Sequence, residues 1–399
     1  MLIEIILFIA LGILAGTFTG LIPGIHINLI GVSIVSASAT ILSSIGSVYI
    51  ITFITSMAIT HTFLDFIPSI FLGCPDTDTE LSVLPGHDLL KSGKGYEAIM
   101  LTTYGSIAAI FVLILISFPS VFVLSKTYFY LQKVIPYILI AVIFFLIYTE
   151  QKRISAIIAI LLTGALGFIV LNMESLKEPL LPLLTGLFGS SMLFLSIKNQ
   201  TKIPEQEITK PKIDKSFISP LFGAAIASPI SSLLPGLGSG QAAIIGNSIS
   251  KSGPRGFLFL LGATNTLVMG FSFIALYTVS RTRTGAAVAI QNIVGEFSWQ
   301  ILILILGVVL ISGVVSFFLT LFLSEFFSKR ISKINYTTLS ITTLAFITGI
   351  IFLFSGLLGA VVFIIATLTG IYCISLNVRR TNMMGCLLIP TIIFYLFGV

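Results

Sequence analysis

Charged residues are scarce in this chain. Asp, Glu, Lys and Arg make up 9% of its 399 residues, hydrophobic residues make up 56%, and the mean hydropathy is +1.12. A soluble domain carries about 25% charged residues, so this composition excludes a soluble globular protein. Apolar runs long enough to cross a bilayer recur along the whole chain. The sequence therefore predicts a polytopic membrane protein, whose net charge of +6 describes its loops and gives no indication of nucleic-acid binding.

Cysteine and histidine are also rare, with three of each. Cys74, Cys373 and Cys386 form no spaced pair that indicates a redox or metal site. No further ligand joins His61 and Asp65 at a fixed spacing, so we expect no metal. The stretch GLGSGQ lacks the Gly-Lys-Ser/Thr ending of a phosphate-binding loop, and no Ser-His-Asp order indicates hydrolysis. We therefore predict no cofactor and no enzymatic activity.

Two proline-glycine pairs interrupt the apolar pattern at matching places. Pro23-Gly24 lies in GTFTGLIPGIHINLIG, and Pro235-Gly236 lies 212 residues later in SPISSLLPGLGSGQAAIIG. Proline removes a backbone donor and glycine reaches conformations that other residues avoid, so each pair ends one helical piece and lets another begin. Broken helices in corresponding halves of a membrane protein point to a transporter's binding site. We therefore predict broken or re-entrant helices at both pairs, which form two walls of one site.

One polar linker divides the chain near its midpoint. The linker contains IKNQTKIPEQEITKPKIDKS, and seven hydrophobic segments lie on each side of it. We predict a first transmembrane repeat at residues 1–197, a cytoplasmic linker at 198–215 and a second repeat at 216–399. The segments are expected near 2–22, 27–45, 47–72, 98–124, 132–149, 154–171 and 179–196, and near 217–234, 241–250, 256–279, 297–324, 337–354, 357–376 and 383–398.

Short sequence matches relate the two halves. THT at Thr60–Thr62 corresponds to TNT at Thr264–Thr266, and five such matches occur in the same order at offsets between 204 and 212. They indicate an internal duplication. When the Lys and Arg clusters face the cytoplasm, the loop at 150–153 lies inside while its counterpart near Ser355 lies outside. The sequence therefore predicts an inverted repeat with both chain ends outside, within an all-α fold.

Polar side chains that are costly in a bilayer lie close to the predicted breaks. The register sets the acidic pair Asp76 and Asp78 against Arg281 and Arg283, which would hold an anion or pair with those acids. Alternatively, both stretches are interfacial loops with solvated charges. The predicted substrate-binding residues are Pro23, Gly24, His26, Asn28, Pro235, Gly236, Gly238, Ser239, Gly240, Gln241, Asn265, Arg281 and Arg283. The predicted residues for a coupling ion or proton are His61, Asp65, Asp76 and Asp78, with Glu80 close by.

Their positions in the sequence give separate reasons to select His26 and Asp65. His26 follows the first break by two residues, where helix N–H groups favour an anion; alternatively it is a neutral histidine bonded to a backbone carbonyl. Asp65 follows His61 by four residues, a spacing that puts both on one helical face.

Several motifs resemble those of a known family. GTFTGLIPG, LPGHDLLKSGKGYEAIMLTTYGS from Leu84, LLPGLGSG and GATNT are similar to stretches of TctA, the large membrane subunit of tripartite tricarboxylate transporters, and its single-chain relatives. The resemblance spans nearly the whole chain. It implies substrate contacts at Pro23, Gly24, Pro235, Gly236, Asn265 and their neighbours. The Pro-Gly loops also look like those of families that carry polyprenyl phosphate across the membrane.

Together these features predict a secondary transporter in the cell membrane. It would move an anion of the organic carboxylate class by alternating access, driven by a proton or sodium gradient. The alternative is a translocase for polyprenyl phosphate that uses the same paired helix breaks. The expected partners are an anionic small molecule or a lipid phosphate, together with membrane lipids. The sequence leaves open whether the chain forms a homodimer and whether it requires a small membrane subunit and a binding protein.

Overall fold

The structure, a computed structural model, describes residues 2–22, 46–73, 79–198, 203–233, 238–280, 282, 284–294, 297–333 and 335–398. These ranges are mostly helical, apart from loops such as residues 203–214, and contain no strand. The helices are α1 (Leu2–Leu21), α3 (Ser47–Leu64), α4 (Phe66–Phe71), α5 (Val83–Lys91), α6 (Gly95–Tyr148), α7 (Arg153–Leu171), α8 (Leu180–Leu184), α9 (Ser191–Lys198), α10 (Ile218–Leu233), α11 (Ser239–Ser250), α12 (Pro254–Val279), α13 (Gly285–Val294), α14 (Trp299–Ile331), α15 (Tyr336–Ser375) and α16 (Gly385–Phe397). Short 3-10 helices are η1 (Glu80–Ser82), η3 (Lys215–Phe217) and η4 (Arg380–Met384), and η2 (Thr185–Ser190) is a short π-helix.

Ten described helical stretches are long and apolar enough to cross a membrane. A helix satisfies its backbone groups internally, as the hydrocarbon core of a bilayer requires. This confirms the predicted polytopic all-α fold. Two spans are 94% buried inside the protein, namely Ser47–Phe71, which combines α3 and α4, and Pro254–Val279, which is α12. These two helices form the centre of the molecule.

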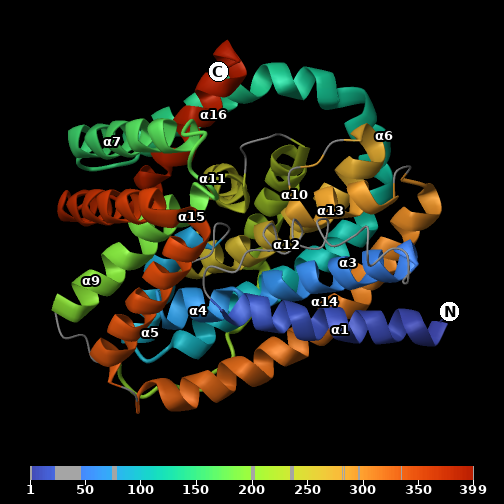
Figure 1. Ribbon diagram of the computed structural model, residues 1–399, viewed down its shortest axis with the longest axis horizontal. Coiled ribbons are helices and arrows are strands. Elements are labelled where there is room, and N and C mark those ends of the chain that lie inside the picture. Colours follow the sequence, from blue (N-terminus) through green and yellow to red (C-terminus); the bar gives the residue numbers. More distant parts are fainter. Residues whose placement is uncertain are drawn as a thin grey trace.

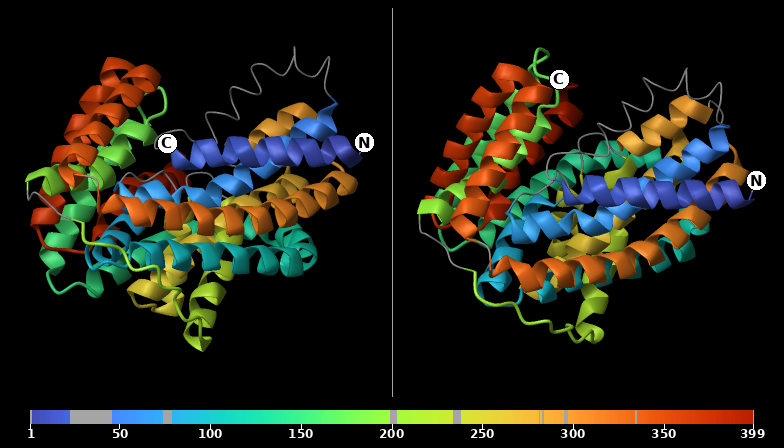
Figure 2. Two further views of the ribbon diagram at one scale, coloured as in Figure 1. Left: turned by 90° about the horizontal axis from the view of Figure 1, so that it is seen from below. Right: turned by 60° about the horizontal axis from the view of Figure 1, so that its bottom comes forward.

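The helices form two lobes (Figures 1 and 2). The larger lobe surrounds α3 and α12 with α1, α6, α10 and α14. In the second lobe α7 packs against α16, and α15 packs against η2 and α9. Figure 2 shows the green and red helices of this lobe inclined to the long helices of the larger one. The two lobes are joined mainly through α6 and α16.

The two halves of the chain are interlocked across the linker. In the larger lobe α3 packs against α14, and α12 packs against α6. In the second lobe α7 packs against α16, and α15 packs against η2 and α9. Each pair joins a helix that precedes the linker to one that follows it. Both halves of the chain therefore build each lobe.

Glycines bring the backbones of α6 and α12 into direct contact. A Cβ added to Gly105 would lie 2.0 Å from the Phe259 carbonyl oxygen, and one added to Gly262 would lie 2.0 Å from the Thr102 carbonyl oxygen. Ser106 adds a hydrogen bond to the Gly262 carbonyl at 3.0 Å. Small residues at a membrane helix interface permit this close van der Waals contact. The interface therefore depends on the absence of a side chain at both glycines.

Most predicted segments correspond to helices, but one predicted break is wrong. The segments 98–124 and 132–149 form a single helix, α6, which continues through Pro119 and Pro136. Proline costs a helix one hydrogen bond, and membrane helices tolerate it where neighbouring groups satisfy the freed carbonyl. Near 355 the predicted break is present, because Gly356 has φ 65° inside α15. Segments 47–72, 154–171, 241–250, 256–279 and 383–398 match α3–α4, α7, α11, α12 and α16 within a few residues, and 27–45 lies outside the described residues.

Replacing Gly262 by alanine tests the α6–α12 contact. The methyl group would collide with backbone, which cannot move like a flexible side chain, so we expect the free energy of unfolding to fall by about 1–3 kcal/mol. Gly307→Ala in α14 is the matched control, because an added Cβ there meets nothing within 4 Å. The free energy of unfolding of the control should be unchanged or rise by up to about 1 kcal/mol, because alanine favours a helix more than glycine does. Thermal unfolding in detergent measures both, and equal midpoints would contradict the packing argument.

Candidate functional site

The Thr-x-Thr motifs of the two halves meet where α3 crosses α12. The hydroxyls of Thr62 and Thr266 are hydrogen-bonded at 3.2 Å. Asn265 Nδ2 donates to Asp65 Oδ2 at 2.7 Å and to the Thr62 carbonyl oxygen at 3.4 Å. All four side chains are buried. The polar groups that the sequence aligns by register therefore contact each other in the centre of the protein.

Asp65 lies where α3 ends and α4 begins. Pro68 explains the break, because it has no N–H and its ring blocks the carbonyl of Leu64. The Asp65 N–H donates to the His61 carbonyl at 3.0 Å, and the Ser69 hydroxyl donates to the Asp65 carbonyl at 2.7 Å. The helix is thus interrupted while neighbouring polar groups remain bonded. This interruption positions the Asp65 carboxylate opposite α12.

Close packing of α1 against α3 positions His61. A Cβ added to Gly16 would lie 2.5 Å from the Met57 carbonyl oxygen, so glycine is required for this approach. Thr19 Oγ1 consequently lies 3.0 Å from His61 Nδ1. The imidazole is 4% exposed. Its orientation therefore depends on α1, the helix that leads into the first Pro-Gly pair.

The start of α11 follows the second Pro-Gly pair. The Gly238 N–H donates to Gln241 Oε1 at 2.7 Å, a capping contact that fixes the helix start. Ser239 and Gln241 are buried in this first turn. The first N–H groups of a helix have no partner within the helix, and the helix dipole places partial positive charge there. Such a start favours a negatively charged group.

The Glu80 carboxylate packs directly against this helix start. A Cβ added to Gly240 would lie 2.0 Å from Glu80 Oε1. Glu80 is 1% exposed, so its charge is removed from water. A helix N-terminus stabilises a carboxylate in this position. The start of α11 therefore accommodates a carboxylate supplied by the protein itself.

Hydroxyl groups link these two polar contacts. The Ser69 hydroxyl, which bonds to the Asp65 carbonyl, is also hydrogen-bonded to Thr79 Oγ1 at 2.6 Å. Thr79 directly precedes Glu80 in the chain. The Asp65–Asn265 contact and the Glu80–Gly240 contact thus belong to one buried polar region. In the described part of the chain, no three His, Cys, Asp or Glu side chains gather as a metal site requires.

Comparison with known proteins identifies the family. The sequence pattern of the tripartite tricarboxylate transporter TctA family matches residues 6–385, which include both Thr-x-Thr motifs and the start of α11. The chain belongs to this family. An uncharacterised protein of Methanocaldococcus jannaschii is 33% identical to this chain over 406 residues. The match covers 98% of this chain and 99% of that protein. No solved structure matches the chain.

Membership of the TctA family confirms the resemblance seen in the sequence. TctA is a transport family rather than a catalytic one. Together with the ten candidate spans, the family makes this chain a multi-pass membrane component of a transporter. The family's tripartite description implies further subunits and a small anionic substrate.

The structure places part of the predicted site of this TctA-family protein. Asn265 contacts Asp65, and His61 contacts α1. Four predicted residues, Gly238 to Gln241, form the cap and first turn of α11. The other predicted residues lie outside those that the structure describes: Pro23, Gly24, His26, Asn28, Asp76, Asp78, Pro235, Gly236, Arg281 and Arg283.

Sequence reasoning missed Thr19 and Arg380. Thr19 lies between Gly16 and Gly20, and that four-residue glycine spacing is a signal of a close helix contact. The sequence assigns Arg379 and Arg380 together to a cytoplasmic loop. In the structure Arg380 is 9% exposed, whereas its neighbour is on the surface. Nothing in the sequence distinguishes the two arginines.

A substitution at Gly240 tests the contact with Glu80. In Gly240→Ala the methyl group occupies the position of Glu80 Oε1 and displaces the carboxylate, so we expect a loss of about 1–3 kcal/mol in the free energy of unfolding. Adding Glu80→Asp shortens the acid by one methylene and should restore part of this loss. Gly349→Ala, where nothing lies within 4 Å, is the control. No rescue by Glu80→Asp would show that the clash does not involve the carboxylate.

Proposed function

We propose that this chain is the membrane-embedded part of a secondary transporter that moves an organic carboxylate by alternating access. The observation that supports this proposal is the Glu80 carboxylate, which lies buried against Gly240 at the start of α11. A substrate carboxylate would compete with Glu80 for this helix end. The family description, which names tricarboxylates, supports this substrate class over a lipid phosphate.

Coupling to a proton or sodium gradient is assigned to Asp65 and His61. Asp65 is a buried carboxylate at a helix break, and its Oδ2 is held by Asn265 of the other half. Ionisable residues within membrane segments mark ion pathways and proton relays. Protonation of Asp65 or binding of a cation there would change its hydrogen bond to Asn265. Because this bond joins α3 to α12, the ion and the relative position of the two halves would be linked.

An inverted repeat would supply the two conformations, with the first repeat at 1–197, the linker at 198–215 and the second repeat at 216–399. Thr62 and Thr266 occupy equivalent positions in the two repeats and contact each other, as residues on a two-fold axis do. The pairing of α3 with α14 and of α12 with α6 also exchanges equivalent helices. Exchanging the conformations of two such repeats converts an outward-open state into an inward-open one.

The transport mechanism is tested with purified protein in liposomes. We expect labelled citrate to enter the liposomes when a proton or sodium gradient is imposed. If the chain alone shows no uptake, the small membrane subunit and the binding protein are added. Asp65→Asn keeps the shape of the side chain but loses its charge, so gradient-driven uptake should fall by about tenfold or more, equivalent to about 1.4 kcal/mol. Exchange of internal for external citrate should persist.

Glu174→Gln is the matched control, because Glu174 is an exposed carboxylate in the loop after α7. Its gradient-driven uptake should equal that of the wild type. Undiminished uptake by Asp65→Asn would remove Asp65 from coupling. Uptake of a polyprenyl phosphate but not of citrate would overturn the proposed substrate class.

Cysteine labelling tests the inverted topology. Single cysteines are introduced at Gln151, in the loop after α6, and at Leu357, beside the break in α15, in a background that lacks the native cysteines. Both positions are exposed in the structure. An impermeant thiol reagent added outside should modify position 357 and spare position 151 until the membrane is opened. Modification of both from the same side would contradict the inversion.

A further inference from the structure

A cavity with both polar and apolar lining residues lies beside Glu80. Its volume is about 650 Å³, and it lies between α5, the end of α6, α11, the start of α12 and η4. Arg379, Arg380, Asn247 and Ser252 contribute polar groups to its wall. Phe145 and Phe257 are among its apolar residues. The cavity therefore offers both hydrogen-bond donors and apolar surface.

Arg380 is the unusual member of this wall. It is nine-tenths buried, with 9% of its surface exposed. Its Nη2 donates to Met192 Sδ at 2.6 Å, a weak and uncharged acceptor. Its Nη1 has no hydrogen-bond partner, and within the described ranges no carboxylate forms an ion pair with this guanidinium. A buried cation in this state is costly, because the described residues replace only part of the water that it has lost.

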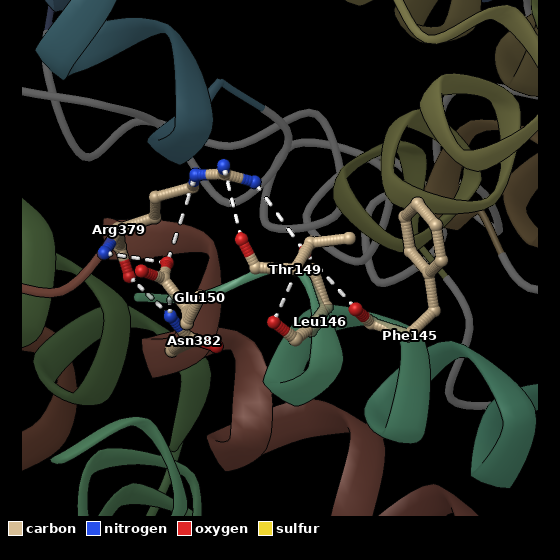
Figure 3. A network of polar contacts seen from close by, with 6 residues as sticks. All are labelled: Phe145, Leu146, Thr149, Glu150, Arg379 and Asn382. Atoms are coloured by element: carbon tan, nitrogen blue, oxygen red, sulfur yellow. Dashed lines mark hydrogen bonds and ion pairs between the residues drawn. The ribbon is translucent and has the colours of Figure 1, made fainter. Parts of the chain in front are cut away.

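The neighbouring Arg379 is paired with the carboxylate of Glu150 (Figure 3). Glu150 Oε1 accepts from the Arg379 backbone N–H at 3.0 Å and from Asn382 Nδ2 at 3.0 Å, and it lies 3.7 Å from Arg379 Nε. The Arg379 guanidinium also reaches the Thr149 carbonyl at 3.4 Å, at the end of α6. These contacts use the Glu150 carboxylate to join η4 to α6. They leave the charge of Arg380 available for another acid.

Three other ionisable groups lie near Arg380. Glu80 and Asp88 line the cavity, but Glu80 is packed against Gly240, and Asp88 is exposed to solvent. Burial, helped by the positive charges of Lys91 and Arg380, lowers the pKa of His87 to about 3, so this imidazole is neutral at physiological pH. The cavity thus keeps a buried positive charge at Arg380.

The start of α12 supplies a second feature that suits an anion. Gly253 is the N-cap and Pro254 the first residue of this helix of 26 residues, and both line the cavity with Ser252. Proline has no N–H, and the Phe257 N–H donates to the Gly253 carbonyl at 2.8 Å, so these residues give the cavity the positive end of the helix dipole and not free donors. Arg380 and this helix start belong to the same cavity. Two independent features therefore favour negative charge in one place.

We propose that this cavity binds an oxyanion, a carboxylate or a phosphate, through Arg380 and the start of α12. A guanidinium presents a planar fork of donors that matches two oxygens of such a group. The side chains of Phe145 and Phe257 would contact the hydrocarbon part of the ligand. Asp65 and Asn265 do not line this cavity, so the proposal stands whether or not Asp65 couples transport. An anion held there shares its cavity with Glu80, which occupies the start of α11.

Titration of purified protein at constant ionic strength tests this site. Citrate and inorganic phosphate are the soluble probes, and nanodiscs with or without phosphatidic acid supply a lipid phosphate. At least one of the three should raise the thermal unfolding temperature of the wild type. Arg380→Gln should weaken the binding of that probe by about tenfold or more. Arg380→Lys should weaken it by less, because lysine keeps the charge but loses the planar pair of donors. Stabilisation by phosphatidic acid alone would identify a lipid head group, and stabilisation by citrate or phosphate a soluble anion.

Stability without an anion separates binding from a structural role. Removing a buried charge that lacks a partner should leave Arg380→Gln at least as stable as the wild type in the absence of probe. Arg330→Gln is the control, because Arg330 is exposed at the end of α14 and its loss should leave the response to the probe unchanged. Equal responses of Arg380→Gln and the wild type, or no response of the wild type to any probe, would overturn the proposal.

Discussion

The hydrogen bond from Asn265 to Asp65 joins the two helices on which the larger lobe depends. α3 and α12 are the most deeply buried candidate spans, and α1, α6, α10 and α14 pack around them. A buried carboxylate without a donor would destabilise this centre by several kcal/mol. The amide of Asn265 supplies the donor, and the adjacent Thr62–Thr266 bond aligns the two motifs. Packing of the lobe and the chemistry of its centre therefore depend on the same residues.

Most hydroxyl groups within the membrane helices do not mark a site. Thr264 and Ser312, for example, donate to carbonyl oxygens of their own helices. Such bonds satisfy the hydroxyl locally, so threonine and serine are tolerated in apolar segments. The informative hydroxyls are those that bond to another helix. Thr62, Thr19 and Ser316 do so, and they are found around the α3–α12 crossing.

Three buried charged groups are accommodated in different ways. Asp65 accepts a hydrogen bond from the side-chain amide of Asn265, and Glu80 lies against the start of α11. Arg380 faces a cavity and contacts an uncharged sulfur. An ion without a compensating group is costly in a low-dielectric interior, and the first two environments each contain a group that lowers this cost. The third is the environment of a site that completes its charge balance with a ligand.

The sequence determined the membrane class, the helical fold and the alignment of the two Thr-x-Thr motifs, because hydropathy and internal repetition are properties of neighbouring or equivalent residues. It also predicted a new helix after Pro235-Gly236, and α11 begins at Ser239. It did not determine that α6 is continuous across residues 125–131, because the polar residues there interrupt the apolar pattern and not the helix. Nor did it determine which acid meets Gly240, or that Arg380 is buried while Arg379 is exposed. Burial and partners depend on segments more than a hundred residues apart, and only the tertiary structure brings those segments together.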